Sequence, residues 1–163
     1  MSTLRGKTAL ITGASGGIGS ALAIKLASEG CNLFLVCRKN VYPLLAELKA
    51  YQVGVEVYAC DFTKKESVSK LLSRLEQRDI DLLVNNAGIF PIKSILDSDE
   101  QDFDDCFSVN VRAPFLLSRQ VAKHMRKKGW GRIINIGSSS SYNGSGETGV
   151  YCASKHALLG LSR

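Results

Sequence analysis

The sequence predicts an α/β fold, in which helices cover both faces of a parallel β-sheet to give three layers (αβα). Three observations predict it. Short apolar runs of strand length alternate along the chain with longer amphipathic stretches. Each intervening stretch is about ten residues or longer, which is enough for the crossover helix between two parallel strands. No internal repeat, low-complexity tract or linker interrupts the alternation, so the 163 residues are expected to form one domain.

The five expected strands are short and rich in β-branched or aliphatic residues. The first, residues 8–11 (TALI), runs into glycines, and the second, residues 32–37 (NLFLVC), is largely apolar. The remaining strands are expected at residues 55–59, 81–84 and 132–136. Parallel strands separated by helices imply right-handed crossovers and the doubly wound arrangement known as the Rossmann fold.

The five expected helices follow the strands and carry apolar residues at helical spacing. The first, residues 17–29, places Ile18, Leu22 and Leu26 on one face and stops at Gly30, a typical C-terminal glycine. The others are expected at residues 41–52, about 64–78, about 99–128 and about 149–163. The sequence therefore predicts five strands, each followed by a helix.

The composition is that of a globular protein, with 45% hydrophobic and 22% charged residues. No apolar run approaches the about 18 residues that a membrane-spanning helix needs, so no membrane segment is expected. The first seven residues lack the features of a signal peptide. The five cysteines are an odd number without a CxxC pair, which indicates free, buried thiols rather than a metal site. We therefore expect a reducing compartment, the cytoplasm.

The formal net charge of +6 comes from 21 basic and 15 acidic residues. The excess is spread along the chain, and its densest cluster falls at the C-terminus of a predicted helix. That cluster is Lys123, Arg126, Lys127 and Lys128. Cations at this end complement the helix dipole. Nucleic-acid binding, which would need a concentrated basic patch, is not expected.

The first strand runs into a glycine-rich turn, TGASGGIG at residues 12–19, where the first helix opens. A strand–turn–helix unit of this kind directs free backbone N–H groups and the positive end of the helix dipole at a phosphate. Glycines also let the backbone approach a pyrophosphate closely. The spacing is neither the usual GxGxxG fingerprint nor the GK[ST] loop of nucleoside triphosphatases.

The spacing TGxxxGxG resembles that of the short-chain dehydrogenase/reductase family, and four further motifs of that family follow in order. They are Asn85-Asn86-Ala87-Gly88, Asn110, Ser138 and the pair Tyr151-x-x-x-Lys155. The resemblance extends from about residue 5 to the end of the chain. It is strongest to the 3-oxoacyl-[acyl-carrier-protein] reductases and related carbonyl reductases. It implies that residues 1–163 are an NAD(P)-binding Rossmann domain that takes part in hydride transfer between a nicotinamide and a carbonyl or alcohol substrate.

The resemblance also implies a set of coenzyme-binding residues. They are Gly13, Ser15, Gly17, Ile18 and Gly19 in the turn, Asn86, Ala87 and Gly88 after the fourth strand, and Asp61, Tyr151 and Lys155. Asp61 would hydrogen-bond the adenine amino group, although its position before Phe-Thr would equally suit a cap for the next turn. The segment from Asn85 to Gly88 could both admit the ribose and stabilise the sheet.

The charges at the end of the second strand indicate NADP(H). An acidic residue there would hold the ribose hydroxyls of NAD(H) and repel a 2′-phosphate. This chain instead has neutral Cys37, followed by Arg38 and Lys39. A guanidinium can pair with a phosphate through two hydrogen bonds, so we predict that Arg38 binds the 2′-phosphate. The alternative is a pair of cations that face the solvent.

Tyr151 and Lys155 are four residues apart, so they share one side of a helix. A phenol exchanges protons poorly at neutral pH because it titrates near pH 10. One ammonium about 4 Å away favours the phenolate by about 4 kcal/mol at an effective dielectric near 20. The resemblance makes Tyr151 the proton donor and Lys155 its partner. It makes Ser138, at the end of the fifth strand, the group that holds the substrate oxygen; three more serines follow, and only the family's spacing selects Ser138.

Asn110 lies inside an apolar-periodic helix, an unfavourable place by helix propensity. Pro114, four residues later, has no N–H, so the Asn110 carbonyl loses its helical partner and a water is the obvious replacement. In the family a proton relay runs from the lysine to such a water, and the resemblance gives Asn110 that role. The alternative is a kinked helix with a satisfied polar residue.

The chain stops inside the helix that carries Tyr151 and Lys155, whereas family members continue with further strands and a loop over the substrate. We therefore expect the family's C-terminal strands to be absent. Two functions stay open: an NADP(H)-dependent oxidoreductase, or a nucleotide- or partner-binding module with little catalysis. In the family the long helix and the tyrosine-bearing helix often form a subunit interface. A homo-oligomer is expected, with Phe115, Leu116 and Leu159 in its interface or in the core.

Overall fold

The protein's structure, a computed structural model, describes residues 4–38 and 41–163. Within these ranges the strands form one parallel sheet in the order β3-β2-β1-β4-β5. The strands are β1 (Thr8–Thr12), β2 (Asn32–Cys37), β3 (Val55–Ala59), β4 (Leu82–Asn85) and β5 (Arg132–Asn135). In the register of the sheet, Leu10 of β1 lies opposite Phe34 of β2 and Leu83 of β4. The predicted parallel α/β fold is confirmed.

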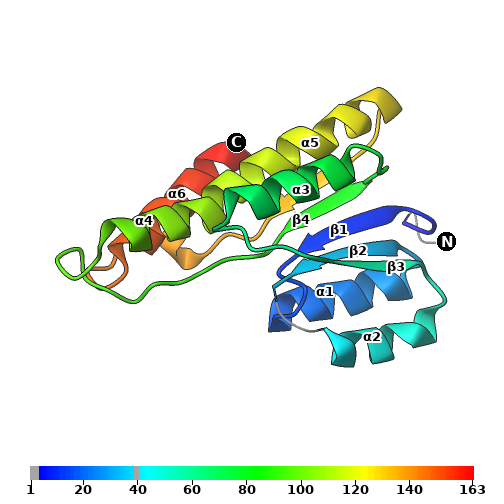
Figure 1. The fold of residues 1–163 in the computed structure, drawn as a ribbon, viewed down its shortest axis with the longest axis horizontal. Helices are drawn as coiled ribbons and strands as arrows, with labels where there is room; N and C mark the ends of the chain where they lie inside the picture. Colours follow the sequence, from blue (N-terminus) through cyan, green and yellow to red (C-terminus); the bar gives the residue numbers. More distant parts are fainter. Residues whose placement is uncertain (1–3, 39–40) are drawn as a thin grey trace.

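Helices cover both faces of the sheet (Figure 1). They are α1 (Gly17–Ser28), α2 (Tyr42–Leu48), α3 (Lys65–Leu75), α4 (Glu100–Phe107), α5 (Ala113–Lys128) and α6 (Gly149–Ser162). Helices α1 and α2 lie on one face, and α3, α4, α5 and α6 lie on the other. A short 3₁₀ turn, Lys49–Tyr51, continues α2, so the helix predicted at residues 41–52 is present but divided.

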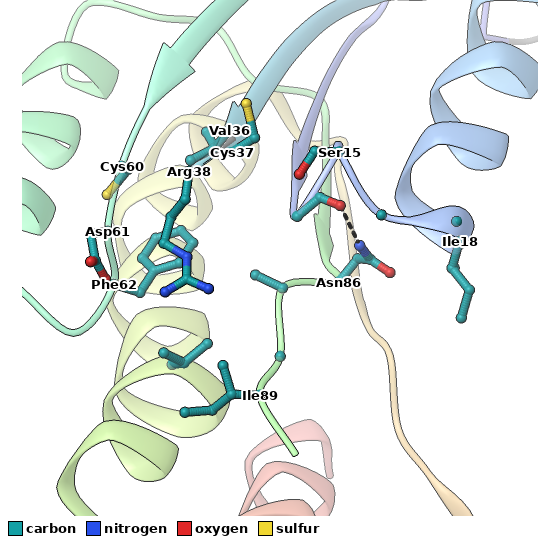
Figure 2. Close-up of a pocket in the computed structure, with 16 residues that line it drawn as sticks. Ser15, Ile18, Val36, Cys37, Arg38, Cys60, Asp61, Phe62, Asn86 and Ile89 are labelled. Atoms are coloured by element: carbon teal, nitrogen blue, oxygen red, sulfur yellow. Dashed lines mark hydrogen bonds between the residues drawn. The ribbon is translucent and has the colours of Figure 1, made fainter. Parts of the chain in front are cut away.

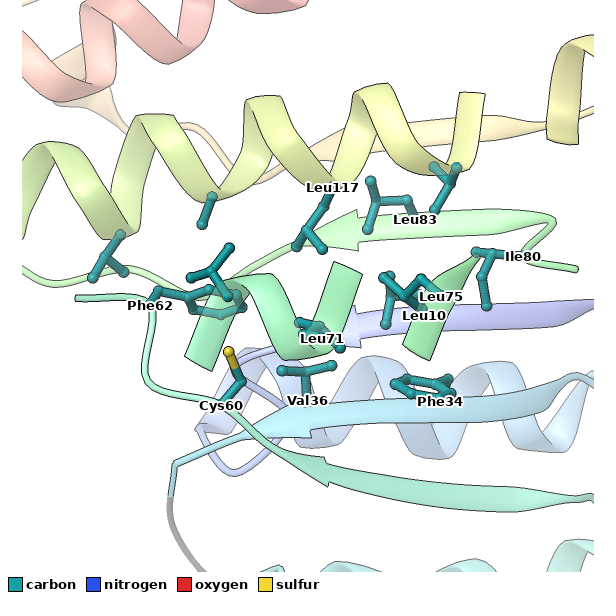
Figure 3. Packing of buried hydrophobic residues seen from close by; sticks show 14 of the residues in the cluster. Leu10, Phe34, Val36, Cys60, Phe62, Leu71, Leu75, Ile80, Leu83 and Leu117 are labelled. Atoms are coloured by element: carbon teal, nitrogen blue, oxygen red, sulfur yellow. The ribbon is translucent and has the colours of Figure 1, made fainter. Parts of the chain in front are cut away.

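Two hydrophobic cores lie against the sheet, one on each face. Leu10, Phe34 and Leu83 pack against Leu71 of α3 and Leu117 of α5 in the first (Figure 3). Their strand neighbours point the other way and pack against α1 and α2 in the second core, which includes Ala9, Ile11, Leu33, Ala23 and Leu44. Strands buried on both faces read as continuous apolar runs, which is why they are visible in the sequence.

The predicted helix at residues 99–128 differs from the structure in one respect. A π-helical turn, Ser108–Arg112, separates α4 from α5, and the Ala113 N–H donates to the Ser108 carbonyl five residues back. Pro114 follows this turn and has no N–H to give to the Asn110 carbonyl. The chain thus accommodates the proline with a widened turn rather than with a break. Such turns occur frequently at functional sites.

The other predicted boundaries lie within a few residues of the observed ones, as expected for element ends. In the parts of the chain that the structure describes, no helix is both long and apolar enough to cross a membrane. All five cysteines are buried and free, as predicted. Strand β5 lies at the edge of the sheet, and its Ile133 and Ile134 side chains are exposed.

The order of the strands creates a crevice. Strand β1 has β2 on one side and β4 on the other, so the chain leaves β1 in one direction across the sheet and later returns in the opposite one. In open α/β sheets, ligands bind at such a switch point, outside the carboxyl ends of the strands. The glycine-rich turn follows β1 at this place.

Candidate active site

The glycine-rich turn packs directly on the segment that follows β4. Gly13 has a φ of +67°, and a Cβ there would lie 2.9 Å from the Cα of Ala87. A Cβ on Gly19 would lie 2.3 Å from the carbonyl oxygen of Gly13. Neither position has room for a side chain. Gly19 is buried beneath the turn and does not line the pocket above it, so the structure gives this residue a packing role.

Hydrogen bonds join the turn to the start of the Asn86–Gly88 segment. The Asn86 side-chain amide donates to the carbonyls of Thr12 (2.9 Å) and Gly13 (3.1 Å). In return, the Thr12 hydroxyl accepts from the backbone N–H groups of Asn86 and Ala87, each at 3.0 Å. These four bonds hold the carboxyl ends of β1 and β4 together, which is the sheet-stabilising role that the sequence allows for this segment.

A pocket of about 450 Å³ opens at the carboxyl ends of β1 to β4 (Figure 2). Nine predicted coenzyme residues line it, namely Gly13, Ser15, Gly17, Ile18, Arg38, Asp61, Asn86, Ala87 and Gly88. Sequence reasoning missed part of the lining, namely Gly16, Val36, Cys60, Phe62, Ile89 and Val109. The missed residues directly adjoin named motifs, and most are apolar, as the walls of ligand pockets usually are. Position next to a motif is therefore the signal that could have found them.

At the end of β2 the pocket is lined by a neutral thiol, that of Cys37, and by a cation, that of Arg38. Burial raises the pKa of the Cys37 thiol, so this side chain stays neutral. Arg38 lies near Asp61 in the lining of the pocket (Figure 2). Lys39, the second predicted cation, lies outside the described residues.

Asp61 caps the turn after β3, as one of its two predicted roles requires. Its carboxylate accepts from the backbone N–H of Thr63 at 3.0 Å and from the Thr63 hydroxyl at 2.9 Å. Burial pushes the pKa of this carboxyl upward, but the Thr63 hydrogen bonds and the charges of Arg38 and Lys64 outweigh it and lower the pKa overall. Because Asp61 also lines the pocket, capping and ligand contact are compatible.

Tyr151 and Lys155 lie one turn apart on α6, with the Lys155 ammonium 5.8 Å from the centre of the Tyr151 ring. Lys155 is only 6% exposed and donates to the carbonyl of Ile136 at 2.7 Å. Burial lowers the pKa of this lysine, and nearby Cys106 acts in the opposite direction. A buried cation beside a partly exposed phenol is an arrangement that can stabilise a phenolate.

Ser138 follows β5 and begins the short turn Ser139–Ser141. Its hydroxyl oxygen accepts from the Ser140 N–H at 3.1 Å. Among the described residues none accepts the Ser138 O–H, so this hydrogen remains available to a ligand. No hydrogen bond joins Ser138 to Tyr151 in the described part of the chain, although α6 packs against the turn that Ser138 begins.

Asn110 is buried, and its side chain is fully engaged. Its amide oxygen accepts from the Ile89 N–H, and its amide nitrogen donates to the Ile89 carbonyl, each at 3.0 Å. The same nitrogen donates to the Ser154 hydroxyl at 3.0 Å, and that hydroxyl donates to the Tyr151 carbonyl at 2.7 Å. The side chain of Asn110 therefore ties the segment after β4 to α6. Sequence reasoning missed Ser154, which only the folded arrangement brings to Asn110.

The predicted residues fall into two groups on the carboxyl side of the sheet. The coenzyme residues, apart from Gly19, Tyr151 and Lys155, line the pocket at the switch point. The four predicted catalytic residues, Asn110, Ser138, Tyr151 and Lys155, do not line that pocket; they lie in the π turn, after β5 and on α6. The segment after β4 links the two groups, because Ile89 lines the pocket and also bonds Asn110.

Comparison with known proteins gives relatives that are named as reductases or dehydrogenases. The chain is 38% identical over 163 residues to the 3-oxoacyl-[acyl-carrier-protein] reductase of Rickettsia prowazekii, covering all of this chain and 66% of that protein. The bulky-bulky ketone specific alcohol dehydrogenase of Comamonas testosteroni has a similar structure, with a TM-score of 0.91, 34% identity and coverage of 96% and 64%. A short-chain dehydrogenase of Sphingobium yanoikuyae in complex with NADPH matches with a TM-score of 0.91, 32% identity and coverage of 96% and 63%.

The chain thus spans just under two thirds of the length of these relatives. The family model described as short chain dehydrogenase matches residues 7–163, which include the glycine turn, the pocket and both residues of the Tyr151–Lys155 pair. On the strength of that match, the chain belongs to the short-chain dehydrogenase family.

Proposed function

We propose that this protein is an NADP(H)-dependent oxidoreductase that transfers hydride between the nicotinamide coenzyme and a small carbonyl or alcohol substrate. The observation that carries the proposal is the pocket at the switch point. Its glycine turn, neutral Cys37 and cationic Arg38 suit a dinucleotide with a 2′-phosphate, and the buried Lys155 lies beside Tyr151 on the same side of the sheet. NADPH bound to the Sphingobium yanoikuyae relative supports the choice of coenzyme.

The residues of the pocket fit the coenzyme in shape and charge. A Cβ built on Gly17 would meet nothing within 4 Å, so the space above the turn is open. Helix α1 has no acidic residue in its first turn, which leaves its positive end free to attract a phosphate. The Gly13, Ser15 and Gly17 region would hold the pyrophosphate, Arg38 the 2′-phosphate, and Asp61 the adenine.

When bound, the coenzyme supplies or accepts the hydride. In the direction of reduction, the Ser138 O–H would donate to the carbonyl oxygen and orient it. The Tyr151 O–H would transfer its proton to the same oxygen, so that hydride and proton together convert the carbonyl to an alcohol. The Lys155 ammonium would stabilise the phenolate that remains. The carbonyl of Asn110, which Pro114 leaves without a helical donor, would hold the water that returns the proton.

We also propose that the protein forms a homo-oligomer in the cytoplasm. Helices α5 and α6 lie on the face of the sheet away from α1 and α2. Phe115 of α5 is exposed, Leu116 is half-buried and packs against the core on that face, and Leu159 of α6 is half-buried. The five free, buried cysteines fit a reducing compartment.

A coenzyme titration tests the proposal. NADPH binding, followed by fluorescence, should be tighter than NADH binding. The substitution Arg38→Asp should weaken NADPH binding about 10- to 100-fold, since a charge-assisted hydrogen bond contributes about 1.5–3 kcal/mol. Lys123→Asp is the matched control, because Lys123 is an exposed cation of α5 outside the pocket. Unchanged NADPH affinity in Arg38→Asp would contradict the assignment of the 2′-phosphate site.

A panel of ketones and aldehydes then separates the oxidoreductase from a binding module. The oxidoreductase should consume NADPH with at least one of these substrates. Binding of NADPH without oxidation by any of them would favour the binding module.

A further inference from the structure

We propose that Phe90 forms an apolar wall of the carbonyl site beside Tyr151, and that the substrate is therefore a ketone, or the matching secondary alcohol, with a hydrocarbon substituent. This inference rests on the proposed function, because it takes Tyr151 as the group at the reacting carbonyl. It makes Phe90 a residue that determines specificity by contact with the part of the substrate next to that carbonyl.

The first observation is a contact between the two rings. Phe90 and Tyr151 lie far apart in the sequence, yet their ring centres are 4.5 Å apart and their planes meet at 72°. This edge-to-face geometry is a favoured arrangement of two aromatic rings. The Phe90 side chain is nevertheless 54% exposed. Part of its apolar surface therefore packs on Tyr151, and the rest is available to a ligand that approaches the phenol.

The second observation is that one amide, that of Asn110, bonds the backbone next to Phe90 directly and the backbone of Tyr151 through Ser154. Asn110 bonds both the N–H and the carbonyl of Ile89, the residue before Phe90. It also bonds Ser154, whose hydroxyl donates to the carbonyl of Tyr151. The backbone that leads to Phe90 and the backbone that carries Tyr151 are thus fixed to one buried side chain. The ring contact therefore lies between two stretches of backbone that hydrogen bonds hold in place.

The third observation is the character of the segment that continues from Phe90. Ile92, Ile95 and Leu96 are all exposed, Leu96 to 92%. Lys93, the cation among them, is drawn to α4, where its ammonium bonds Asp102 at 2.6 Å. The segment that continues from Phe90 therefore carries several exposed apolar side chains. A hydrocarbon substituent gains affinity by leaving water for such a surface, whereas a hydroxylated chain does not.

Binding of a ketone series tests the inference without requiring turnover. The full chain is titrated with 2-butanone, 2-hexanone and 2-octanone, with and without NADP⁺, and dissociation constants are read from ligand-observed NMR. In the unsubstituted protein each methylene should tighten binding about two- to fourfold, fourfold being the value for full burial. In Phe90→Ala this dependence on chain length should fall towards none, while Phe90→Leu should keep most of it.

Phe103→Ala is the matched control. Phe103 is exposed to a similar degree (46%), but its ring stacks on Phe107 at 4.3 Å, whereas the ring that contacts Tyr151 is that of Phe90. The control should keep the full dependence on chain length, and circular dichroism should show that all variants fold. Equal dependence in Phe90→Ala and the unsubstituted protein would overturn the inference, as would its loss in Phe103→Ala or its absence from the unsubstituted protein. Dependence on Phe90 without any binding of NADP⁺ would overturn the proposed function and leave the apolar wall in place.

Discussion

Lys155 carries its charge in an unfavourable place. It is almost wholly buried, and within the described residues no carboxylate pairs with it; its hydrogen bond goes to the neutral carbonyl of Ile136. Burial lowers the pKa, so the free-energy cost of the charge is present in full below the folded-state pKa and fades as the pH rises through it. Perturbed titratable groups of this kind cluster at functional sites. The loss of stability from the buried charge has a functional reason if the Lys155 ammonium stabilises the phenolate of Tyr151.

At the scale of single residues, the role of Tyr151 as the acid can be tested by removing its hydroxyl group. Tyr151→Phe keeps the ring and its contact with Phe90 but has no proton to give. NADPH affinity should stay within about twofold, while turnover of a ketone substrate should fall about 10²- to 10⁴-fold, the usual contribution of a general acid. Turnover is followed by the absorbance of NADPH. Tyr42→Phe, which alters an exposed tyrosine at the start of α2 on the other face of the sheet, should leave turnover unchanged. Survival of turnover in Tyr151→Phe would mean that another group is the acid.

At the scale of elements, the connection from β1 to α1 shows that two glycines of one turn are required for different physical reasons. Gly19 admits no Cβ because the carbonyl of Gly13 lies directly against it, whereas Gly17 has open space around it and lines the pocket. Gly19 must be a glycine so that α1 can begin close to the turn. Gly17 must be a glycine only if a ligand occupies the space next to it. The sequence motif does not distinguish these two requirements, because both positions carry the same residue.

Alanine substitutions separate the two requirements. Gly19→Ala should lower the free energy of unfolding by about 1–3 kcal/mol, the usual range for overpacking, and should also weaken NADPH binding because the turn must shift. Gly17→Ala should keep or slightly raise stability, since alanine is the better helix former, yet still weaken NADPH binding by intruding on the pocket. Urea unfolding and NADPH titration measure the two effects. If Gly17→Ala binds NADPH normally, the pyrophosphate does not lie over this turn.

At the scale of the whole molecule, the sequence predicts the elements better than their arrangement. The three central strands, β2, β1 and β4, are predictable because burial on both faces makes them continuously apolar, as in Leu33–Val36. The strand order is not, because the pairing of Ala9 with Leu82 depends on packing between distant segments. The pocket follows from motifs at strand ends. The contacts of Phe90 and Ser154 do not, because partners so far apart in sequence leave no periodic signal.

The opposite end of the sheet offers a test of stability that leaves the site alone. Buried Asp81 accepts from the Thr8 N–H at 2.9 Å and from the Lys128 ammonium at 3.1 Å, so it joins β1, the start of β4 and the end of α5. Asp81→Ala should lower the free energy of unfolding by about 2–3 kcal/mol, because it leaves the Thr8 N–H without its acceptor and removes the nearer of the two carboxylates that pair with Lys128. NADPH affinity should not change.

Asp79→Ala is the control, since Asp79 also pairs with Lys128 but is exposed. Its effect on stability should be about 0–1 kcal/mol, as is usual for surface ion pairs. Equal losses in the two variants, measured by urea unfolding, would show that Asp81 acts only through its charge and not through the Thr8 bond.

The widened turn between α4 and α5 has a consequence for how this chain can change. A π turn contains one residue more than an α turn, and successive helical residues point about 100° apart. Removing the surplus residue would rotate α5, with its buried Leu117 and Val121, against α4 and Asn110. In a shortened chain, either Leu117 and Val121 could stay buried or the Asn110 amide could keep its hydrogen bonds to Ile89, but not both. The number of residues in this stretch is therefore constrained as tightly as their identity, and a deletion here should be far harder to tolerate than a substitution.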